Sequence, residues 1–218
     1  MGRVLKVEAP ALRLDPERVL QVVDWQEIFG SEGRVEIEIG IGKGRFLLAG
    51  AEARPDVHHL GVEWANQYLR IAEARALKRR LTNIRFVRVD ARELVRRIPS
   101  GSVTAYYVFY PDPWPKKRHQ KRRFLQKESV DELARSLVPD GTLHAATDHD
   151  EYWAAIEAVF DPHPAFERLD RFGGNDFPIA VDAPLTNFEE KYASDGRNRH
   201  RASWCRVGPA GFSVPDTG

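Results

Sequence analysis

Three acidic residues stand at the ends of predicted β-strands: Glu38, Glu63 and Asp90. Each lies at or next to the end of a short segment that is typical of a strand, RVEIEI at 34–39, HHLGVE at 58–63 and IRFVRVD at 84–90. Because the carboxyl ends of parallel strands meet at one edge of a sheet, we expect the three carboxylates to line one cleft. Carboxylates in such places accept hydrogen bonds from ribose hydroxyls and amines. For Glu63 and Asp90, capping of the following helix is an alternative role.

The first of these strands runs into a turn that contains Gly40, Gly42 and Gly44. Glycine lets the backbone turn sharply and approach a ligand closely. The dinucleotide fingerprint is G-x-G-x-x-G, and here the third glycine comes one residue early. Three like charges in a cleft also disfavour a polyphosphate, because their repulsion costs free energy. S-adenosylmethionine has a ribose, cationic sulfonium and amino groups and no phosphate, so it fits the cleft better. A tight connection without a ligand is the alternative.

A proline-rich loop, PDPWPKKRHQKRR at 111–123, follows the fourth predicted strand. Prolines at alternate positions fix φ and exclude a helix or an interior strand, so we expect a stiff loop that presents Asp112 and Trp114 beside the cleft. Six of the 33 Lys and Arg residues lie in positions 116–123, so the net charge of +1 becomes −5 without them. Phosphate is the natural counterpart of such a block. A solvated basic face or a localisation signal is the alternative.

Alternating strands and helices position these residues. The predicted strands cover 34–39, 58–63, 84–89, 103–110 and 142–147, with a last strand-like segment at 202–207. Helical spacing covers 46–53, 65–81 and 124–137, a turn is expected at 139–141, and a further helix is expected from Phe188, capped by Thr186 or Asn187. This order predicts an α/β fold with a doubly wound, mostly parallel sheet and helices on both faces. We expect a single domain over 34–218 after an N-terminal extension of residues 1–33.

The composition sets outer limits on the function. The 218 residues are 42% hydrophobic and 30% charged, which excludes a disordered or collagen-like chain. A single cysteine, Cys205, cannot form an internal disulfide and favours a reducing compartment. No apolar run approaches the roughly 20 residues of a membrane span, and the N-terminus lacks a secretory signal, so we expect a cytoplasmic protein. The histidines show no metal-ligand spacing with a cysteine, so no metal site is predicted.

Several motifs resemble, in matching order, those of bacterial tRNA (guanine-N7)-methyltransferases, which are class I S-adenosylmethionine-dependent enzymes. They are EIGIGKG at 38–44, GVE at 61–63, VDA at 89–91, the loop at 111–123, TD at 147–148 and TNFEEKY at 186–192. DPWPKKRH followed by KRR is highly specific, whereas the glycine turn fits any class I methyltransferase. Ile41 departs from the pattern, because an aromatic residue is common there. The first 24 residues match nothing in the family.

The resemblance implies the Rossmann-like methyltransferase fold and methyl transfer to N7 of a guanosine at position 46, in the variable loop of tRNA. It implies that the methyl donor, S-adenosylmethionine, is contacted by the following residues, with Asp112 as the active-site residue: Glu38, Gly40, Gly42, Gly44, Glu63, Asp90, Ala91 and Asp112. It implies that substrate and RNA are contacted by Lys116, Arg118, His119, Gln120, Lys121, Arg122, Arg123, Asp148, Thr186, Asn187, Phe188 and Glu189. The expected partner is tRNA, without a metal or a membrane, and the chain is expected to be a monomer or a homodimer.

Two other functions stay open at this point. A methyltransferase acting on an exocyclic amine carries a D/N-P-P-aromatic loop, and Asp112-Pro113-Trp114-Pro115 lacks the second consecutive proline. A noncatalytic RNA-binding module with a vestigial cofactor pocket is the other. A nicotinamide dehydrogenase is disfavoured by the glycine spacing. For Trp114, stacking on the target base and packing against the prolines of its own loop are equally good expectations.

Overall fold

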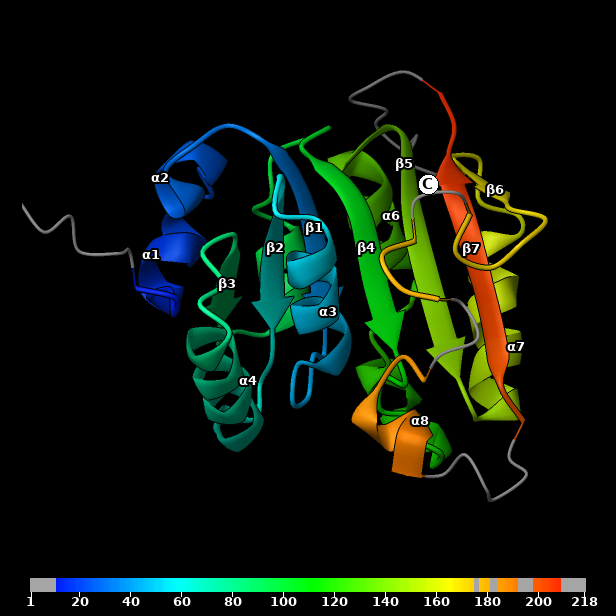
Figure 1. Ribbon diagram of the computed structural model, residues 1–218. Helices are drawn as coiled ribbons and strands as arrows, with labels where there is room; N and C mark the ends of the chain where they lie inside the picture. The colour runs from blue at the N-terminus through cyan, green and yellow to red at the C-terminus, as the bar shows by residue number, and fades with distance from the viewer. Residues whose placement is uncertain (1–10, 175–176, 181–183, 192–197, 209–218) are drawn as a thin grey trace, which may run out of the picture.

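A seven-stranded sheet forms the centre of the protein, in the order β3-β2-β1-β4-β5-β7-β6 (Figure 1). The computed structural model describes residues 11–174, 177–180, 184–191 and 198–208. The strands are β1 Arg34–Ile39, β2 Val57–Val62, β3 Ile84–Val87, β4 Val103–Phe109, β5 Leu137–Thr147, β6 Phe166–Arg168 and β7 His200–Arg206. The first five are parallel, and β7 lies antiparallel to both β5 and β6. This confirms the predicted doubly wound, mostly parallel sheet.

The strand order reverses between β1 and β4. Their register pairs Glu38 with Tyr107 and Ile39 with Val108, so the turn after β1 and the loop after β4 leave the same edge of the sheet next to one another. In open α/β sheets, ligands bind outside the carboxyl ends of the strands at such a reversal. The fold therefore brings the glycine turn and the proline-rich loop to the place where a ligand is expected.

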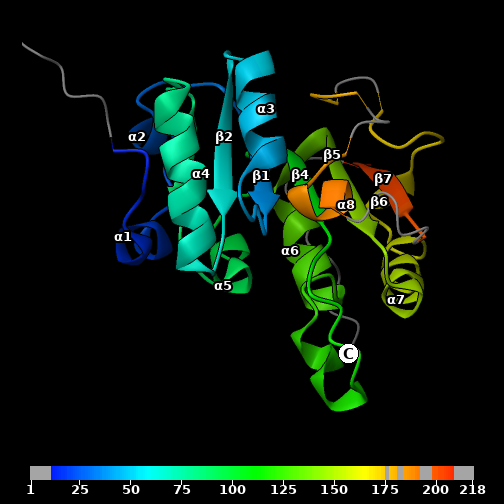
Figure 2. The ribbon, with the colours of Figure 1, turned by 60° about the horizontal axis from the view of Figure 1, so that its bottom comes forward.

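Helices cover both faces of the sheet (Figures 1 and 2). On one face lie α3 Arg45–Ala53 and α4 Asn66–Lys78, and the short α8 Asn187–Lys191 lies at the carboxyl edge. On the other face lie α1 Pro16–Gln21, α5 Ala91–Val95, α6 Lys127–Ser136 and α7 Asp150–Phe160. Because of this double cover the strands are buried on both sides: every residue of β2 and β3 is buried, including the polar residues His58, His59 and Arg85. Among the described residues, no helix is long and apolar enough to cross a membrane.

The sheet departs from the sequence prediction around residues 137–141. β5 begins at Leu137, directly after α6, and runs through the predicted turn. Its register with β4 shifts there, from Val103 opposite Leu137 to Ala105 opposite Thr142, and Asp140 takes a left-handed φ of 61°. The Pro-Asp-Gly signal therefore marks a bulge within the strand. Helix α7 was not predicted at all, and β3 ends two residues before its predicted end.

Residues 11–33 pack against the sheet. Leu12 and Leu14 pair with Phe86 at the outer edge of β3, at 2.8 Å in both hydrogen bonds. The helices α1 and α2 Trp25–Phe29 bury Val19 and Phe29 in the same core as β1 and β4. The division of the chain at residue 34 stays a prediction, and the side chains of 11–33 contribute to the main core.

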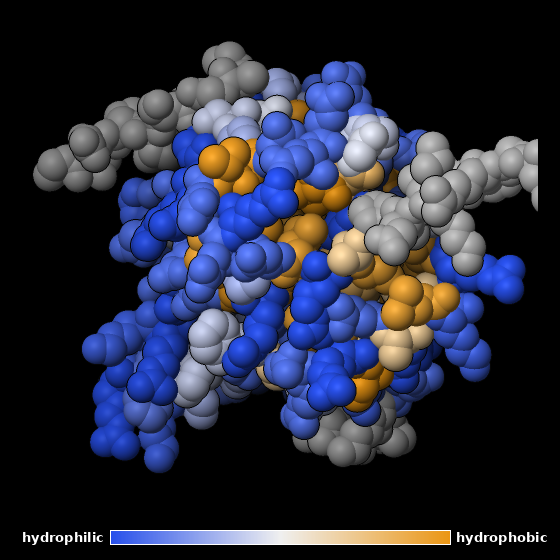
Figure 3. All heavy atoms as spheres, turned by 90° about the vertical axis from the view of Figure 1, so that its left-hand side faces the viewer, coloured by the Kyte–Doolittle hydropathy of each residue, from blue (hydrophilic) through white to orange (hydrophobic). Residues whose placement is uncertain are grey.

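A groove of about 560 Å³ lies on the outer side of the sheet, near β3 and the end of α4. Figure 3 shows this side of the molecule, where apolar atoms gather among largely hydrophilic side chains. Leu12, Phe29, Leu77 and Leu81 are part of the lining. None of the residues predicted to contact donor or RNA lines this groove.

Candidate functional site

The glycine turn leaves open space in front of its backbone. Gly40, Gly42 and Gly44 have φ values of 79°, 52° and 76°, a region that L side chains rarely adopt. A Cβ added at Gly40 or Gly42 would meet no atom within 4 Å, whereas one at Gly44 would lie 2.9 Å from the Cβ of Ala72. The first two glycines thus open the surface to a ligand, and the third lets α3 pack against α4.

Glu38 is buried at the carboxyl end of β1 with an incompletely paired carboxyl group. Its exposed fraction is 2%. Its pKa is raised to about 8, mainly by burial and to a smaller extent by the nearby Glu63 carboxylate, while a hydrogen bond from the Leu47 backbone opposes both effects. The Oε2 atom of Glu38 has no hydrogen-bond partner among the described residues. An unpaired buried carboxyl oxygen is costly, so this position favours a cationic donor group of a ligand.

The other two acidic residues bind backbone amides. Glu63 accepts hydrogen bonds from the amides of Gly42 and Ala65, both at 2.8 Å, and so ties the glycine turn to the start of α4. Asp90 caps α5 by accepting the Arg92 amide at 2.8 Å. The capping role considered from the sequence is therefore present for Asp90. An ionised carboxylate offers about four acceptor positions, so both groups retain capacity for a ligand.

The loop after β4 holds Asp112 between two residues with left-handed backbone. Tyr110 has a φ of 52° and Trp114 a φ of 43°, which is rare for large side chains and is found where the surrounding structure enforces it. The Tyr110 amide donates to the carbonyl of Ala146 at 2.7 Å. Burial, assisted by the charge of Glu189, raises the pKa of Tyr110 to about 12. Asp112 itself is exposed.

Residues 116–123, here called the basic tongue, project from the carboxyl edge. They form the 3-10 helix η1 Lys117–Arg122, and Figure 2 shows the green segment after β4 extending beyond the sheet and its helices. The five cations at 116–118, 121 and 122 are exposed, and His119 and Gln120 are half-buried. The guanidinium of Arg122 lies 4.9 Å from the centre of the Trp114 ring, and His119 meets the ring edge-on. Trp114 thus packs against the tongue, which neither expectation for it included.

Arg123 differs from the rest of the tongue. It is 5% exposed, and its Nε donates to the carbonyl of Pro113 at 2.8 Å. Its guanidinium also lies 4.8 Å from the centre of the Tyr152 ring. This side chain is turned inward and holds the loop, so we do not count it among the exposed cations.

Within the TNFEEKY segment, Asn187–Lys191 form α8. Thr186 caps it, as one of the two candidate caps was predicted to do, because its Oγ1 accepts the Glu189 amide at 3.1 Å. Glu189 is 3% exposed; its Oε2 accepts the Leu185 amide at 2.7 Å, and its Oε1 pairs with Arg201 of β7. Asn187 has a buried Oδ1 without a hydrogen-bond partner in the described part of the chain. The side chain of Phe188 lies outside the described residues.

Asp148 and the glycine turn complete the carboxyl edge. Asp148 is half-buried one residue after the end of β5.

At the start of α3, Arg45 donates from Nε to the carbonyl of Pro184 at 3.1 Å and pairs with Glu190. These contacts bring α8 beside the glycine turn, although the two segments are about 140 positions apart in the sequence. Arg45, Tyr110 and Arg201 also assemble this edge, and nothing in the local sequence around them signals their distant partners.

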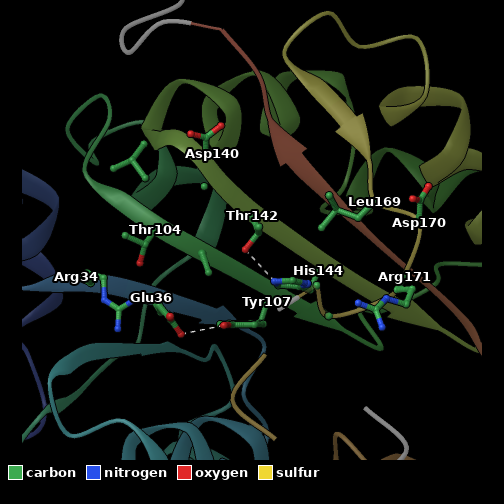
Figure 4. A pocket seen from close by; sticks show the side chains of 15 residues that line it. Arg34, Glu36, Thr104, Tyr107, Asp140, Thr142, His144, Leu169, Asp170 and Arg171 are labelled. Atoms are coloured by element: carbon green, nitrogen blue, oxygen red, sulfur yellow. Dashed lines mark hydrogen bonds between the residues drawn. The ribbon is translucent and has the colours of Figure 1, made fainter. Parts of the chain in front are cut away.

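A separate cavity of about 500 Å³ is lined by residues of β1, β4 and β5 and of the segment after β6 (Figure 4). Its polar groups pair with one another: Tyr107 Oη donates to Glu36 Oε2 at 2.9 Å, and Thr142 Oγ1 lies 2.9 Å from His144 Nε2. Burial lowers the pKa of His144 to about 3, so the ring is neutral. None of the predicted site residues lines this cavity. Within the described ranges, no group of three or more His, Cys, Asp or Glu residues is arranged to hold a metal ion.

Comparison with known proteins identifies the family. The model of the family described as "Putative methyltransferase" matches residues 32–202. A tRNA (guanine-N(7)-)-methyltransferase of Aliivibrio salmonicida is 37% identical over 79% of this chain and 73% of its own length, and one of Mycobacterium ulcerans is 39% identical over 84% of this chain and 66% of its own. The solved structure of the antibiotic-resistance methyltransferase Kmr has the same fold, with a TM-score of 0.55 over 85% of this chain and 95% of that one, at 20% identity. The chain belongs to the tRNA (guanine-N(7)-)-methyltransferase family.

Proposed function

We propose that this chain transfers a methyl group from S-adenosylmethionine to N7 of guanosine 46 in the variable loop of tRNA. One observation carries the proposal: a buried carboxyl oxygen that no described residue pairs with lies beside an open glycine turn, at the same sheet edge as the Asp112 loop and the exposed cations of the tongue. The family relatives, which carry the name of this activity, support the same conclusion.

The residues at the carboxyl edge fit the donor. Glu38 would pair with its amino group, because its Oε2 is an acceptor that the described residues leave unpaired. Glu63 and Asp90 would accept the ribose hydroxyls and the adenine amine, beside the backbone of Ala91 and of the glycine turn. When bound, the donor supplies an electrophilic methyl group on a sulfonium.

Asp112 would act on the guanine. N7 of guanine carries an in-plane lone pair and no proton, so it is a nucleophile without a general base. The ring becomes cationic as N7 is alkylated, and a carboxylate that accepts hydrogen bonds from N1–H and the 2-amino group is favoured more in the transition state than before it. Asp112 has the charge and exposure for this role, and Asp148 is a second candidate.

The basic tongue would bind the RNA backbone. Its exposed cations are free of carboxylate partners among the described ion pairs, so they are available to phosphates. We include Lys116, Arg118, Lys121 and Arg122 in this surface, with His119 and Gln120 beside them. Thr186 and Asn187 would face the substrate at the start of α8, where the buried Asn187 Oδ1 has no hydrogen-bond partner among the residues that the structure describes.

The decisive experiment is methyl transfer from labelled donor into unmodified tRNA, followed by aniline cleavage, which cuts RNA at N7-methylated guanosine. We expect label and a single cut in the variable loop. Asp112→Asn should lower kcat by roughly 10²- to 10³-fold, far more than it lowers donor affinity measured by calorimetry. Label that resists aniline cleavage would indicate an exocyclic amine as acceptor, and donor binding without label in RNA would indicate a binding module; either result contradicts the proposal.

A further inference from the structure

We propose that Arg123 is a positioning residue that fixes the Asp112 loop and does not contact RNA, although it belongs to the basic run of the sequence. This inference rests on the proposed function, because it assigns a role in methyl transfer. It separates the basic run into an outer, RNA-facing part and one inner residue that acts through Asp112.

The contacts of Arg123 point toward the loop and away from solvent. The side chain is 5% exposed. Its Nε donates to the carbonyl of Pro113, the residue directly after Asp112, at 2.8 Å. Its Nη2 lies 3.4 Å from Oε1 of Glu151 on α7, and its guanidinium stacks on the Tyr152 ring at 4.8 Å. A planar group that hydrogen-bonds and stacks at once defines orientation as well as position.

The backbone around Arg123 is anchored as well. Its carbonyl accepts a hydrogen bond from Arg92 of α5 at 3.0 Å, and its amide donates to the carbonyl of Gln120 at 2.9 Å. The phenol oxygen of Tyr152, beneath the guanidinium, accepts the amide of Leu125 at 3.1 Å. Arg123 is therefore held between α5 and α7. Its hydrogen bond to the Pro113 carbonyl in turn fixes the position of Pro113.

Asp112 thus lies between two fixed points. Upstream, the Tyr110 amide is bonded to the end of β5 at 2.7 Å, and downstream the Pro113 carbonyl is bonded to Arg123. The backbone between these two hydrogen bonds has little freedom, because the segment from 111 to 113 contains two prolines, Pro111 and Pro113, whose φ is fixed. Methyl transfer depends on alignment, and a displacement of about 1 Å can cost roughly 10²-fold in rate. Loss of the downstream anchor should therefore appear in the rate of the chemical step.

Arg122 provides the matched control. It is adjacent in sequence, has the same charge and is exposed, and its guanidinium stacks on Trp114. Arg123→Gln should lower kcat by roughly 10²-fold while KM for tRNA and its salt dependence stay as in the wild type. Arg122→Gln should instead act on RNA binding. It should raise KM for tRNA and make the slope of log K against log salt smaller by about 1. A raised KM and a smaller slope in Arg123→Gln, with kcat retained, would overturn the inference.

A second measurement reads the loop without turnover. Arg123→Lys and Arg122→Lys both keep the charge and a trypsin site, so the cleavage rates within the tongue can be compared directly. We expect faster cleavage in Arg123→Lys only, because lysine cannot reproduce the planar contacts. Addition of guanidinium to Arg123→Ala should partly restore kcat, with sodium chloride as the salt control. Equal cleavage of the two lysine variants would contradict the positioning role, whereas an inactive wild-type chain would contradict the proposed function.

Discussion

Glu38 carries an ionisable group at a position where the folded chain holds its proton far more tightly than the unfolded chain does. Burial is the main cause, and the neighbouring Glu63 carboxylate adds to it. Perturbed groups of this kind gather at functional sites, because a ligand can supply the missing partner. The same property makes Glu38 destabilising to the ligand-free protein once it ionises, and this can be measured without any ligand.

The pH dependence of Glu38 follows from its pKa in the two states. The carboxyl titrates near 4.5 when unfolded and near 8 when folded, so the folded chain binds more protons between these values and its stability falls as the pH rises through them. Glu38→Gln removes this loss. We expect similar melting temperatures for wild type and variant at pH 5, and a variant that melts at least about 3 °C higher at pH 8.5.

Thermal unfolding followed by circular dichroism measures these melting temperatures. The other titrating groups are the same in wild type and variant, so their effects cancel in the difference. Asp90→Asn is a suitable control, since that carboxylate is exposed and hydrogen-bonded to an amide. A Glu38→Gln effect of equal size at both pH values would mean that Glu38 ionises normally in the folded protein.

At the scale of elements, the basic tongue is a separate segment that projects from the carboxyl edge of the sheet. Its charge is borne by exposed side chains on η1, while its attachment depends on the buried Arg123 and on Arg92, which donates to the Arg123 carbonyl. Phosphate binding and attachment can therefore be altered independently.

Neutralising the tongue should weaken RNA binding in a salt-dependent way. In the triple variant Arg118→Gln, Lys121→Gln, Arg122→Gln, we expect lower tRNA affinity and a slope of log K against log salt smaller by about 2 to 3, because each lost phosphate contact removes somewhat less than one unit. Filter binding at several salt concentrations measures both quantities.

The control removes three cations from the opposite face of the sheet. Arg70, Lys78 and Arg80 are exposed on or just after α4, which Figure 2 shows on the far side of the sheet from α5 and α6. Their replacement by Gln changes the net charge equally. If both triple variants shift the slope alike, the tongue has no special role in RNA binding.

The elements could be predicted where the local sequence pattern by itself determines the local backbone structure. β4 is buried over almost its whole length and reads as a β-branched and aromatic run, and the turn after β1 needs glycine because its φ values are positive. The inward turn of Arg123 and the pairing of Glu189 with Arg201 were not predictable, since a contact between distant segments leaves no trace in the sequence around either partner. The bulge in β5 was misread for a related reason: a Pro-Asp-Gly signal describes the backbone bend and not whether pairing continues beyond it.

At the scale of the whole molecule, the segment before β1 completes the core. Phe29 is 7% exposed, stacks on the His58 ring at 4.4 Å and lies under the guanidinium of Arg85 at 5.3 Å. Arg85 is 1% exposed and bonds only to backbone carbonyls among the hydrogen bonds described, from Ile28, Thr82 and Ile84. The ring of Phe29 therefore covers a buried cation as well as apolar surface.

Phe29→Ala should destabilise the protein strongly, although Phe29 precedes the sheet and lies far from the carboxyl edge. Loss of a buried phenylalanine costs about 3 to 5 kcal/mol, a large part of the roughly 5 to 15 kcal/mol that stabilises a typical domain. Val22→Ala, in the same segment but 66% exposed, should cost less than about 0.5 kcal/mol. Urea unfolding of both variants gives the comparison. A small cost for Phe29→Ala would show that residues before Arg34 are a dispensable extension, whereas the expected large cost means that the methyltransferase domain begins before β1.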